Sequence, residues 1–300
     1  MHLKLISALV ATSLGAAPVL AQELTGTLKK IKETGAVSLG HRESSVPFSY
    51  YDDRQQVVGY AMDLCARIVD RVKSELKLDK LETKLNPVTS ATRIPLMANG
   101  TIDLECGSTT NNLERQKQVA FTITHFVTAN RFVSKKSANL QTVDDLKGKT
   151  VVSTSGTTNI KQITEIGAQK GLNLNILAAK DHAEAFLMVE TGRAAAFVMD
   201  DILLFSLVAA SKSPKDYAIS NDALSVEPYG IMLRRDDPSF KKVVDEAMIA
   251  TYKSGAINPI YEKWFLKPIP PKGINLNVPV SDAFKKVIAS PTDSGDPAVY

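Results

Sequence analysis

The sequence has little cysteine and no recognisable metal-binding spacing. Its 300 residues include two cysteines, one tryptophan and four histidines. It contains no Cys-x-x-Cys pair and no His-Glu-x-x-His motif, so we expect neither a metal centre nor a cofactor. A Gly-x-Ser-x-Gly motif, which places a nucleophilic serine on a strained turn, is also missing. These absences argue against metal-dependent enzymes and serine-nucleophile enzymes.

The chain also lacks a strong excess of either charge. The 36 basic and 32 acidic residues give a net charge of +4, which offers no electrostatic basis for binding nucleic acid. After residue 21, no apolar stretch approaches the length that a membrane-spanning helix needs. The remaining composition, with 44% hydrophobic and 23% charged residues, is that of an ordinary globular protein.

The first 21 residues have the pattern of a secretory signal peptide. Lys4 precedes a mainly apolar run over residues 5–14, and small residues lead to a predicted cleavage site near Ala21. We therefore expect the mature protein to be exported to the periplasm, and no cysteine adjoins the cleavage site to carry a lipid anchor. In an exported chain Cys65 and Cys106 could form one disulfide, or both could be buried small hydrophobes; the sequence favours neither alternative.

Strand and helix patterns alternate along the mature chain. This alternation predicts an α/β fold with mainly parallel sheets. Two extended, β-rich segments near residues 126–134 and 224–232 suit two lobes joined by two crossovers, with a cleft between them. The chain from residue 267 is rich in Pro and Asn and is expected to form a surface strap. Expected strands cover residues 36–41, 81–87, 102–106, 151–153, 174–177, 194–199 and 217–220, and expected helices cover 28–35, 60–76, 91–99, 159–170, 183–191, 202–211 and 236–253.

The stretch over residues 105–121, ECGSTTNNLERQKQVAF, is the strongest candidate for a ligand site. It runs from a strand end through a turn rich in hydroxyl and amide side chains, including Ser108 and Thr110, into a predicted helix that contains Arg115. Backbone N–H groups at a helix N-terminus bind anions, and the arginine fork matches a carboxylate. The alternative is that these polar residues only cap the helix.

A second strand, hydroxyl turn and helix unit follows at residues 150–170. It contains Ser155-Gly156-Thr157-Thr158, where the glycine permits a close backbone approach and Thr157 and Thr158 begin a helix. Because it repeats the first unit, we expect the two to contribute to one site from opposite lobes.

Three polar residues of the first half stand at element ends. Arg42 follows a strand, where open α/β folds bind ligands, although an ordinary surface position is the commoner fate of an arginine. Ser90 is a predicted N-cap, and Arg93 lies in the first turn of the same helix. A positive side chain there opposes the helix dipole, which is a hint that Arg93 serves a ligand.

The second half offers His182, Asp200 and Asp201. His182 begins a helix, a position more typical of a neutral packing or capping residue than of a ligand contact. Asp200 and Asp201 end a strand; we expect one to cap the next helix and the other to pair with a cation.

Taken in order, the motifs of the whole mature chain are similar to those of one family. They are Gly59-Tyr60 with Asp63, Arg93-Ile94-Pro95-Leu96, Asn99-Gly100 with Asp103, Ser108-Thr109-Thr110 with Glu114-Arg115 and Ala120-Phe121, Leu146-Lys147-Gly148-Lys149, Gly156-Thr157-Thr158, Gly192-Arg193-Ala194 leading to Asp200, and Tyr229-Gly230. The chain resembles the exported amino-acid-binding proteins that serve ATP-driven uptake transporters, which have the type II periplasmic binding protein fold. Residues 41–50 and 105–112 look like the glutamate/aspartate-binding branch.

The resemblance implies roles for the candidate residues. Arg115 would bind the α-carboxylate of an amino acid, with donors from Ser108, Thr110, Thr157 and Thr158, and Asp200 would meet the α-ammonium. The groups left for an acidic side chain are Arg42, Arg93 and His182, with Ser90 as a further donor. The expected lobes are residues 22–128 with 230–300, and residues 129–229.

These features predict a monomeric binding protein that closes on L-glutamate or L-aspartate and delivers it to the membrane subunits of an ABC transporter. One alternative is an exported, dehydratase-like enzyme on the same fold. Such an enzyme needs a positioned acid or base, and the chain offers only His182 and a few carboxylates. The other alternative is a ligand-sensing module for a membrane receptor. The sequence leaves open the preference between glutamate and aspartate.

Overall fold

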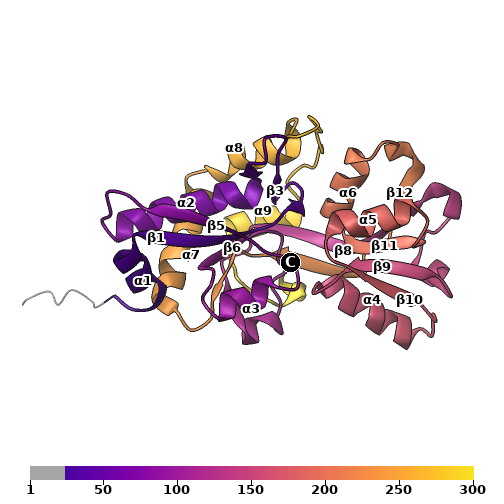
Figure 1. The fold of residues 1–300 in the computed structure, drawn as a ribbon, viewed down its shortest axis with the longest axis horizontal. Coiled ribbons are helices and arrows are strands. Elements are labelled where there is room, and N and C mark those ends of the chain that lie inside the picture. The colour runs from indigo at the N-terminus through magenta and orange to yellow at the C-terminus, as the bar shows by residue number, and fades with distance from the viewer. Residues whose placement is uncertain (1–23) are drawn as a thin grey trace, which may run out of the picture.

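The computed structural model describes residues 24–300, so the predicted signal peptide lies outside the described residues. Figure 1 shows two lobes side by side, each built on a sheet covered by helices. In the described part of the chain, no helix is both long and apolar enough to cross a membrane. Each sheet is sealed by the apolar faces of its helices, which is the layered arrangement that alternating strands and helices predict.

The first lobe contains a five-stranded sheet in the order β5-β1-β6-β14-β7. The strand β1 (Ala36–His41) pairs in parallel with β5 (Glu82–Pro87) and β6 (Leu104–Cys106), whereas β14 (Met232–Arg234) runs antiparallel to β6 and β7 (Val119–Phe121). Its helices are α1 (Gly26–Thr34), α2 (Tyr60–Glu75), α3 (Arg93–Ala98), α7 (Pro238–Lys253), α8 (Ile257–Tyr261), which continues as a π-helical turn Glu262–Leu266, and α9 (Asp282–Ala289).

The second lobe contains a sheet in the order β10-β9-β11-β8-β12, with β13 also paired to β8. Here β9 (Thr150–Thr154) is parallel to β10 (Asn175–Ala179) and β11 (Ala196–Asp200), and β8 (Phe126–Lys135) is antiparallel to β11, β12 (Tyr217–Ile219) and β13 (Ser225–Tyr229). Its helices are α4 (Thr158–Gln169), α5 (His182–Glu190) and α6 (Asp201–Ala210).

The two predicted extended segments lie next to each other. The strands β8 and β13 pair from Phe126 with Tyr229 to Asn130 with Ser225. The chain passes from β7 of the first sheet into β8, and from β13 back into β14 of the first sheet. The α/β class and the two crossovers are therefore confirmed. Parallel pairing holds only within β5-β1-β6 and within β10-β9-β11, because β14 and β8, which adjoin the crossovers, run antiparallel to them.

Three local predictions are wrong. The helix expected around Arg115 is only a 3-10 turn, Arg115–Lys117, because β7 begins two residues later and leaves no room for a longer helix. The expected strands include none between residues 42 and 58, yet this region forms a small antiparallel sheet of β2 (Ser44–Ser45), β3 (Ser49–Tyr51) and β4 (Val57–Val58). The expected C-terminal strap includes the helix α9, whose Phe284 and Val287 are buried.

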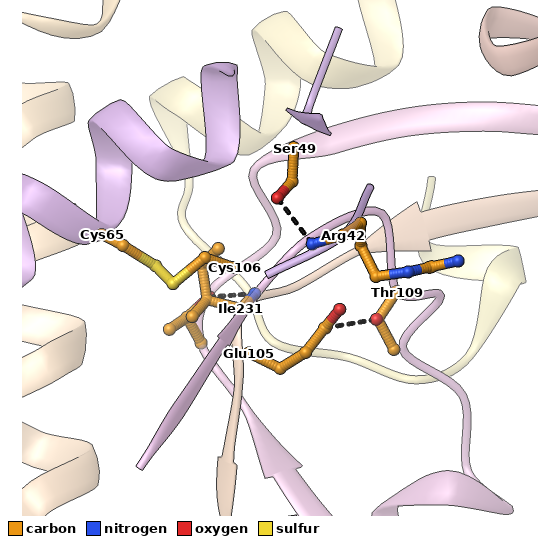
Figure 2. The surroundings of a disulfide bond; sticks show 8 residues. Arg42, Ser49, Cys65, Glu105, Cys106, Thr109 and Ile231 are labelled. Atoms are coloured by element: carbon orange, nitrogen blue, oxygen red, sulfur yellow. Dashed lines mark hydrogen bonds between the residues drawn. A yellow bond between two sulfur atoms is a disulfide. The ribbon is translucent and has the colours of Figure 1, made fainter. Parts of the chain in front are cut away.

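Cys65 and Cys106 form a disulfide, with Cα atoms 6.2 Å apart. Figure 2 shows that it ties α2 to the end of β6. The bond resolves the alternative that the sequence left open. It also fixes the strand end from which the candidate residues of the 105–121 stretch emerge.

Candidate functional site

A small polar cavity lies between the two lobes. The empty space at this site is about 200 Å³, part of which opens to solvent. It is lined by Ser90, Arg93, Ser108, Thr110, Thr157, Thr158, Asn159, His182, Met199, Asp200 and Leu203. Eight of the ten sequence-predicted site residues are thus brought together. Arg42 and Arg115, the other two, are hydrogen-bonded to groups at its edge.

Arg42 and Arg93 lie close together at the first-lobe end of the cavity. Both are only 2% exposed, and Arg42 Nη2 donates a 2.8 Å hydrogen bond to Ser90 Oγ. The Ser90 hydroxyl is thus an acceptor for Arg42 rather than the helix cap that the sequence predicted. The helix α3 begins at Arg93, with Thr92 at its N-cap position and no side-chain cap. The surface position considered for Arg42 is wrong, since its guanidinium is buried.

Arg115 lies at the edge of the cavity, on the 3-10 turn after β6. Its Nη1 donates to Thr110 O at 2.9 Å, and its Nη2 donates to Gly156 O at 3.2 Å. The pKa of Arg115 is lowered to about 9, mainly by burial and also by the nearby charge of Arg93, while the Glu227 carboxylate acts in the opposite direction. At this position no regular helix supplies N–H groups, so the donors offered to an anion are the guanidinium and the nearby hydroxyls.

The loop before α4 meets the first lobe at Gly156. This residue has φ +77°, and a Cβ there would lie 2.5 Å from Ala91 Cα, so the predicted close backbone approach is confirmed. Thr157 caps α4 by accepting from Ile160 N at 3.2 Å. Thr158 lines the cavity and donates to Glu227 at 3.0 Å. Of these contacts, the hydrogen bond from Arg115 to Gly156 O and the close approach of Gly156 to Ala91 join the two lobes beside the site.

His182 is buried at the start of α5. Its Nδ1 lies 2.8 Å from Thr154 Oγ1, and its Nε2 has no partner within residues 24–300. Burial, together with the charges of Arg42 and Arg93, holds the pKa of His182 well below its usual range. The imidazole is therefore neutral, as the sequence predicts for this position, and it also lines the cavity.

Asp200 lies at the second-lobe end of the cavity, at the carboxyl end of β11. It accepts from Asn159 Nδ2 at 2.7 Å and from the Tyr229 hydroxyl. It occupies the N-cap position of α6, but its side chain makes no capping bond there. Asp201 pairs with Arg131 at 3.2 Å. One acidic residue thus pairs with a cation as expected, whereas the expected side-chain cap is wrong.

The pKa of Asp200 is raised to about 7, mainly by burial and also by the charge of Glu227. The hydrogen bonds from Tyr229 and Asn159 act in the opposite direction because they stabilise the ionised form. A cation placed beside Asp200 would favour the carboxylate. This end of the site is suited to an ammonium group.

Several buried atoms around the cavity have hydrogen-bonding capacity that the described residues do not use. Within residues 24–300, no partner is found for Arg42 Nη1, Arg93 Nε, Ser108 Oγ or His182 Nε2. Unpaired buried polar groups are costly, so clustered ones mark a place built for a polar ligand. No group of three or more His, Cys, Asp or Glu side chains in the same range is placed to hold a metal ion.

Sequence reasoning missed two kinds of residue at the site. Asn159, Met199 and Leu203 line the cavity, and only their positions next to Thr158 and Asp200 could have drawn attention to them. The buried carboxylates of Glu105 and Glu227 stand behind the arginines, each at most 1% exposed. An acidic residue inside an otherwise apolar strand, as in the sequence LEC, is the signal that could have indicated Glu105.

Two α/β lobes, two extended crossovers and a polar site between the lobes define a two-lobed solute-binding protein of the type II periplasmic class. The pattern of the bacterial extracellular solute-binding proteins, family 3, matches residues 37–267, and the chain belongs to this family.

Known relatives extend over most of the chain. The L-glutamate/L-aspartate-binding protein of Pseudomonas aeruginosa is 54% identical over 290 residues, which is 96% of each chain. The glutamate/aspartate import solute-binding protein of Escherichia coli is 48% identical over 267 residues, covering 89% of this chain and 88% of the relative. Among solved structures, a mutant of ArgBP from T. maritima is 28% identical with a TM-score of 0.70, covering 79% of this chain and 98% of the other.

Proposed function

We propose that this chain is an exported solute-binding protein that captures L-glutamate or L-aspartate between its two lobes and delivers it to an ABC-type membrane transporter. The observation that carries the proposal is the cluster of three buried arginines, Arg42, Arg93 and Arg115, around a cavity with one ammonium-accepting end at Asp200. Such a site suits a small zwitterion with a second carboxylate. The names of the relatives from P. aeruginosa and E. coli agree with this ligand.

The ligand is oriented by two groups of side chains. Its α-carboxylate lies on Arg115, with donors from Ser108, Thr110, Thr157 and Thr158, and its ammonium lies on Asp200. Its side-chain carboxylate lies toward Arg42 and Arg93, with Ser90 and His182 beside them. The hydrogen bond between Arg42 and Ser90 and the effect of both arginines on His182 support this second group.

Binding is coupled to closure of the lobes. The proposed lobes are residues 22–128 with 230–300, and residues 129–229, so the crossovers at β8 and β13 act as the hinge. Because Arg115 belongs to one lobe and Thr158 and Asp200 to the other, only the closed form makes both sets of contacts. Ligand therefore favours closure, and the closed form is the one that the transporter recognises.

The partner and the location follow from the same proposal. The protein works in the periplasm as a monomer after removal of a signal peptide near Ala21, with the membrane subunits of the transporter as its partner. The named relatives are binding and import proteins rather than enzymes, which favours transport over the dehydratase-like alternative.

Calorimetric titration of the purified protein with each common amino acid tests the proposal. We expect micromolar or tighter binding of L-glutamate and L-aspartate, and no new product after hours of incubation. Tight binding of only neutral or basic amino acids would contradict the acidic ligand. Product formation would contradict the assignment as a binding protein.

A further inference from the structure

Glu105 is a fully buried carboxylate just behind the arginines of the site. Successive side chains of a strand point to opposite faces, so on β6 the side chain of Cys106 turns toward α2 and that of Glu105 turns the other way, toward Arg42 and Arg93. Figure 2 shows the Glu105 and Thr109 side chains pointing toward one another near Arg42. Glu105 does not line the cavity, so any role in binding must act through other residues.

Thr109 connects Glu105 to Arg93. Arg93 Nη1 donates a 2.6 Å hydrogen bond to Thr109 Oγ1, and the Thr109 hydroxyl donates in turn to Glu105 Oε2. All three side chains are buried, which strengthens a charge-assisted chain of this kind. The hydroxyl uses its single proton on Glu105, so its lone pairs are directed at Arg93. Thr109 and Glu105 together therefore fix the position of the Arg93 guanidinium.

The aliphatic stem of Arg42 lies near the other oxygen of the same carboxylate. A Cβ on Gly107 would stand 2.3 Å from Glu105 Oε1 and 3.0 Å from the Arg42 Cγ, so the missing side chain of Gly107 leaves a space that both groups border. Glu105 Oε1 has no hydrogen-bond partner within residues 24–300. A buried and unpaired carboxylate oxygen is costly unless positive charge lies near it.

The charge of Glu105 offsets the repulsion between two buried arginines. Burial lowers the pKa of Arg93, and the Glu105 carboxylate is the largest opposing influence. The pKa of Arg42 is lowered to about 10, mainly by burial and also by the charge of Arg93, and Glu105 again acts in the opposite direction. Two buried guanidinium groups can stay together here because the Glu105 carboxylate lies behind them.

We propose that Glu105, acting through Thr109, is the positioning residue that holds Arg93 and Arg42 as a paired receptor for the side-chain carboxylate of an acidic amino acid. This inference rests on the proposed function. According to this inference, Glu105, a buried strand residue, makes the site select a ligand with a side-chain carboxylate over one with a neutral amide. Loss of Glu105 or of the Thr109 hydroxyl misplaces the receptor for the side-chain carboxylate and leaves the Arg115 receptor for the α-carboxylate in place.

The test measures the affinities for L-glutamate and L-glutamine by calorimetry in the wild type, Glu105→Gln and Thr109→Val. A hydrogen bond to a charged group contributes enough that we expect L-glutamate affinity to fall about 10-fold to 100-fold in both variants. We expect the affinity for L-glutamine to change by less than about threefold, since its side chain makes no ion pair. The ratio of the two affinities is the readout.

Two further variants separate positioning from general damage. Thr109→Ser keeps the hydroxyl and is expected to restore most of the ratio. Thr251→Val removes another buried threonine hydroxyl, which bonds Ala247 O at 2.8 Å on α7, and is expected to leave both affinities unchanged. Thermal unfolding of each variant monitors folding, and Thr109→Val, which keeps the size of the side chain, decides the matter if Glu105→Gln does not fold.

The outcomes distinguish this inference from the function on which it rests. Equal losses for both ligands in Thr109→Val, or an unchanged ratio, would overturn the role of Glu105. The role would also be overturned if Thr109→Ser lowered the ratio of L-glutamate to L-glutamine affinity as much as Thr109→Val does. The hydroxyl would then have no part in the selection. A wild type that binds no acidic amino acid would contradict the proposed function, and the role of Glu105 with it.

Discussion

Binding of an amino acid is expected to weaken as the pH falls through 7, because of Asp200. With Asp200 buried between the lobes, its raised pKa of about 7 means that half of this form carries a neutral side chain at that pH when no ligand is bound. A neutral carboxyl group cannot pair with the ligand ammonium, so only the ionised fraction is competent to bind. The affinity for the ligand therefore rises with pH, and binding of the ligand releases the proton from Asp200.

The size of the change in apparent Kd follows from the fraction of the protein in which Asp200 is ionised. For a single group of pKa about 7, the apparent Kd increases about twofold at pH 7 and about tenfold at pH 6, relative to its limit at high pH. Between pH 6 and 8 the ligand carboxylates stay ionised, and the low pKa of His182 keeps that imidazole neutral. The change in this window therefore reports Asp200.

Calorimetry at several pH values, in buffers of different ionisation enthalpy, measures both the Kd and the protons released. We expect about half a proton to be released for each ligand bound at pH 7. Asp200→Asn serves as the control, since its residual binding should be weak and independent of pH in this range. A wild-type Kd that is constant from pH 6 to 8, with no proton release, would refute the pairing of Asp200 with the ammonium.

Three further predictions concern the site and its support. Arg115→Ala should abolish binding of every amino acid, whereas Arg93→Ala should weaken L-glutamate much more than L-glutamine; calorimetric titrations in which both variants behave alike would mean that the two carboxylates are wrongly assigned. Replacing Cys65 and Cys106 by alanine removes a link across 41 residues and should lower the free energy of unfolding by about 4 kcal/mol, measured by denaturant titration; an unchanged midpoint would contradict this. Gly156→Ala places a Cβ against the opposite lobe and should lower the affinity for every ligand about tenfold or more. Wild-type affinities in this variant, measured by the same titrations, would disprove the need for this contact.

Much of the fold could be predicted because its signals are local. The strand Ala36–His41 and the helix that begins at Tyr60 carry regular apolar patterns, and the structure has them at the predicted positions. The region of residues 42–58 was less accessible, because strands of two or three residues show no periodicity. The helix expected around Arg115 fails for a tertiary reason, since the strand β7 takes the residues that it would need.

The sequence predicted most of the residues that line the candidate site, but not the residues that hold them in position. Hydroxyls and arginines at element ends indicate a ligand site, and eight of the predicted residues line one cavity. What sequence reasoning could not find is the pairing behind them: Ser90 with Arg42, Tyr229 with Asp200, and Glu105 with Thr109. These contacts join residues that are 48, 29 and 4 positions apart in the chain. The first two depend on how the sheets are assembled, and no single-sequence pattern encodes that.

The proposed binding mode can be seen directly in a crystal structure of the protein with bound L-glutamate. We expect one ligand in the cavity between the lobes, with its α-carboxylate on Arg115, its ammonium on Asp200 and its side-chain carboxylate toward Arg42 and Arg93. A ligand bound outside this cavity, or one with its two carboxylates exchanged between the arginines, would disprove this binding mode.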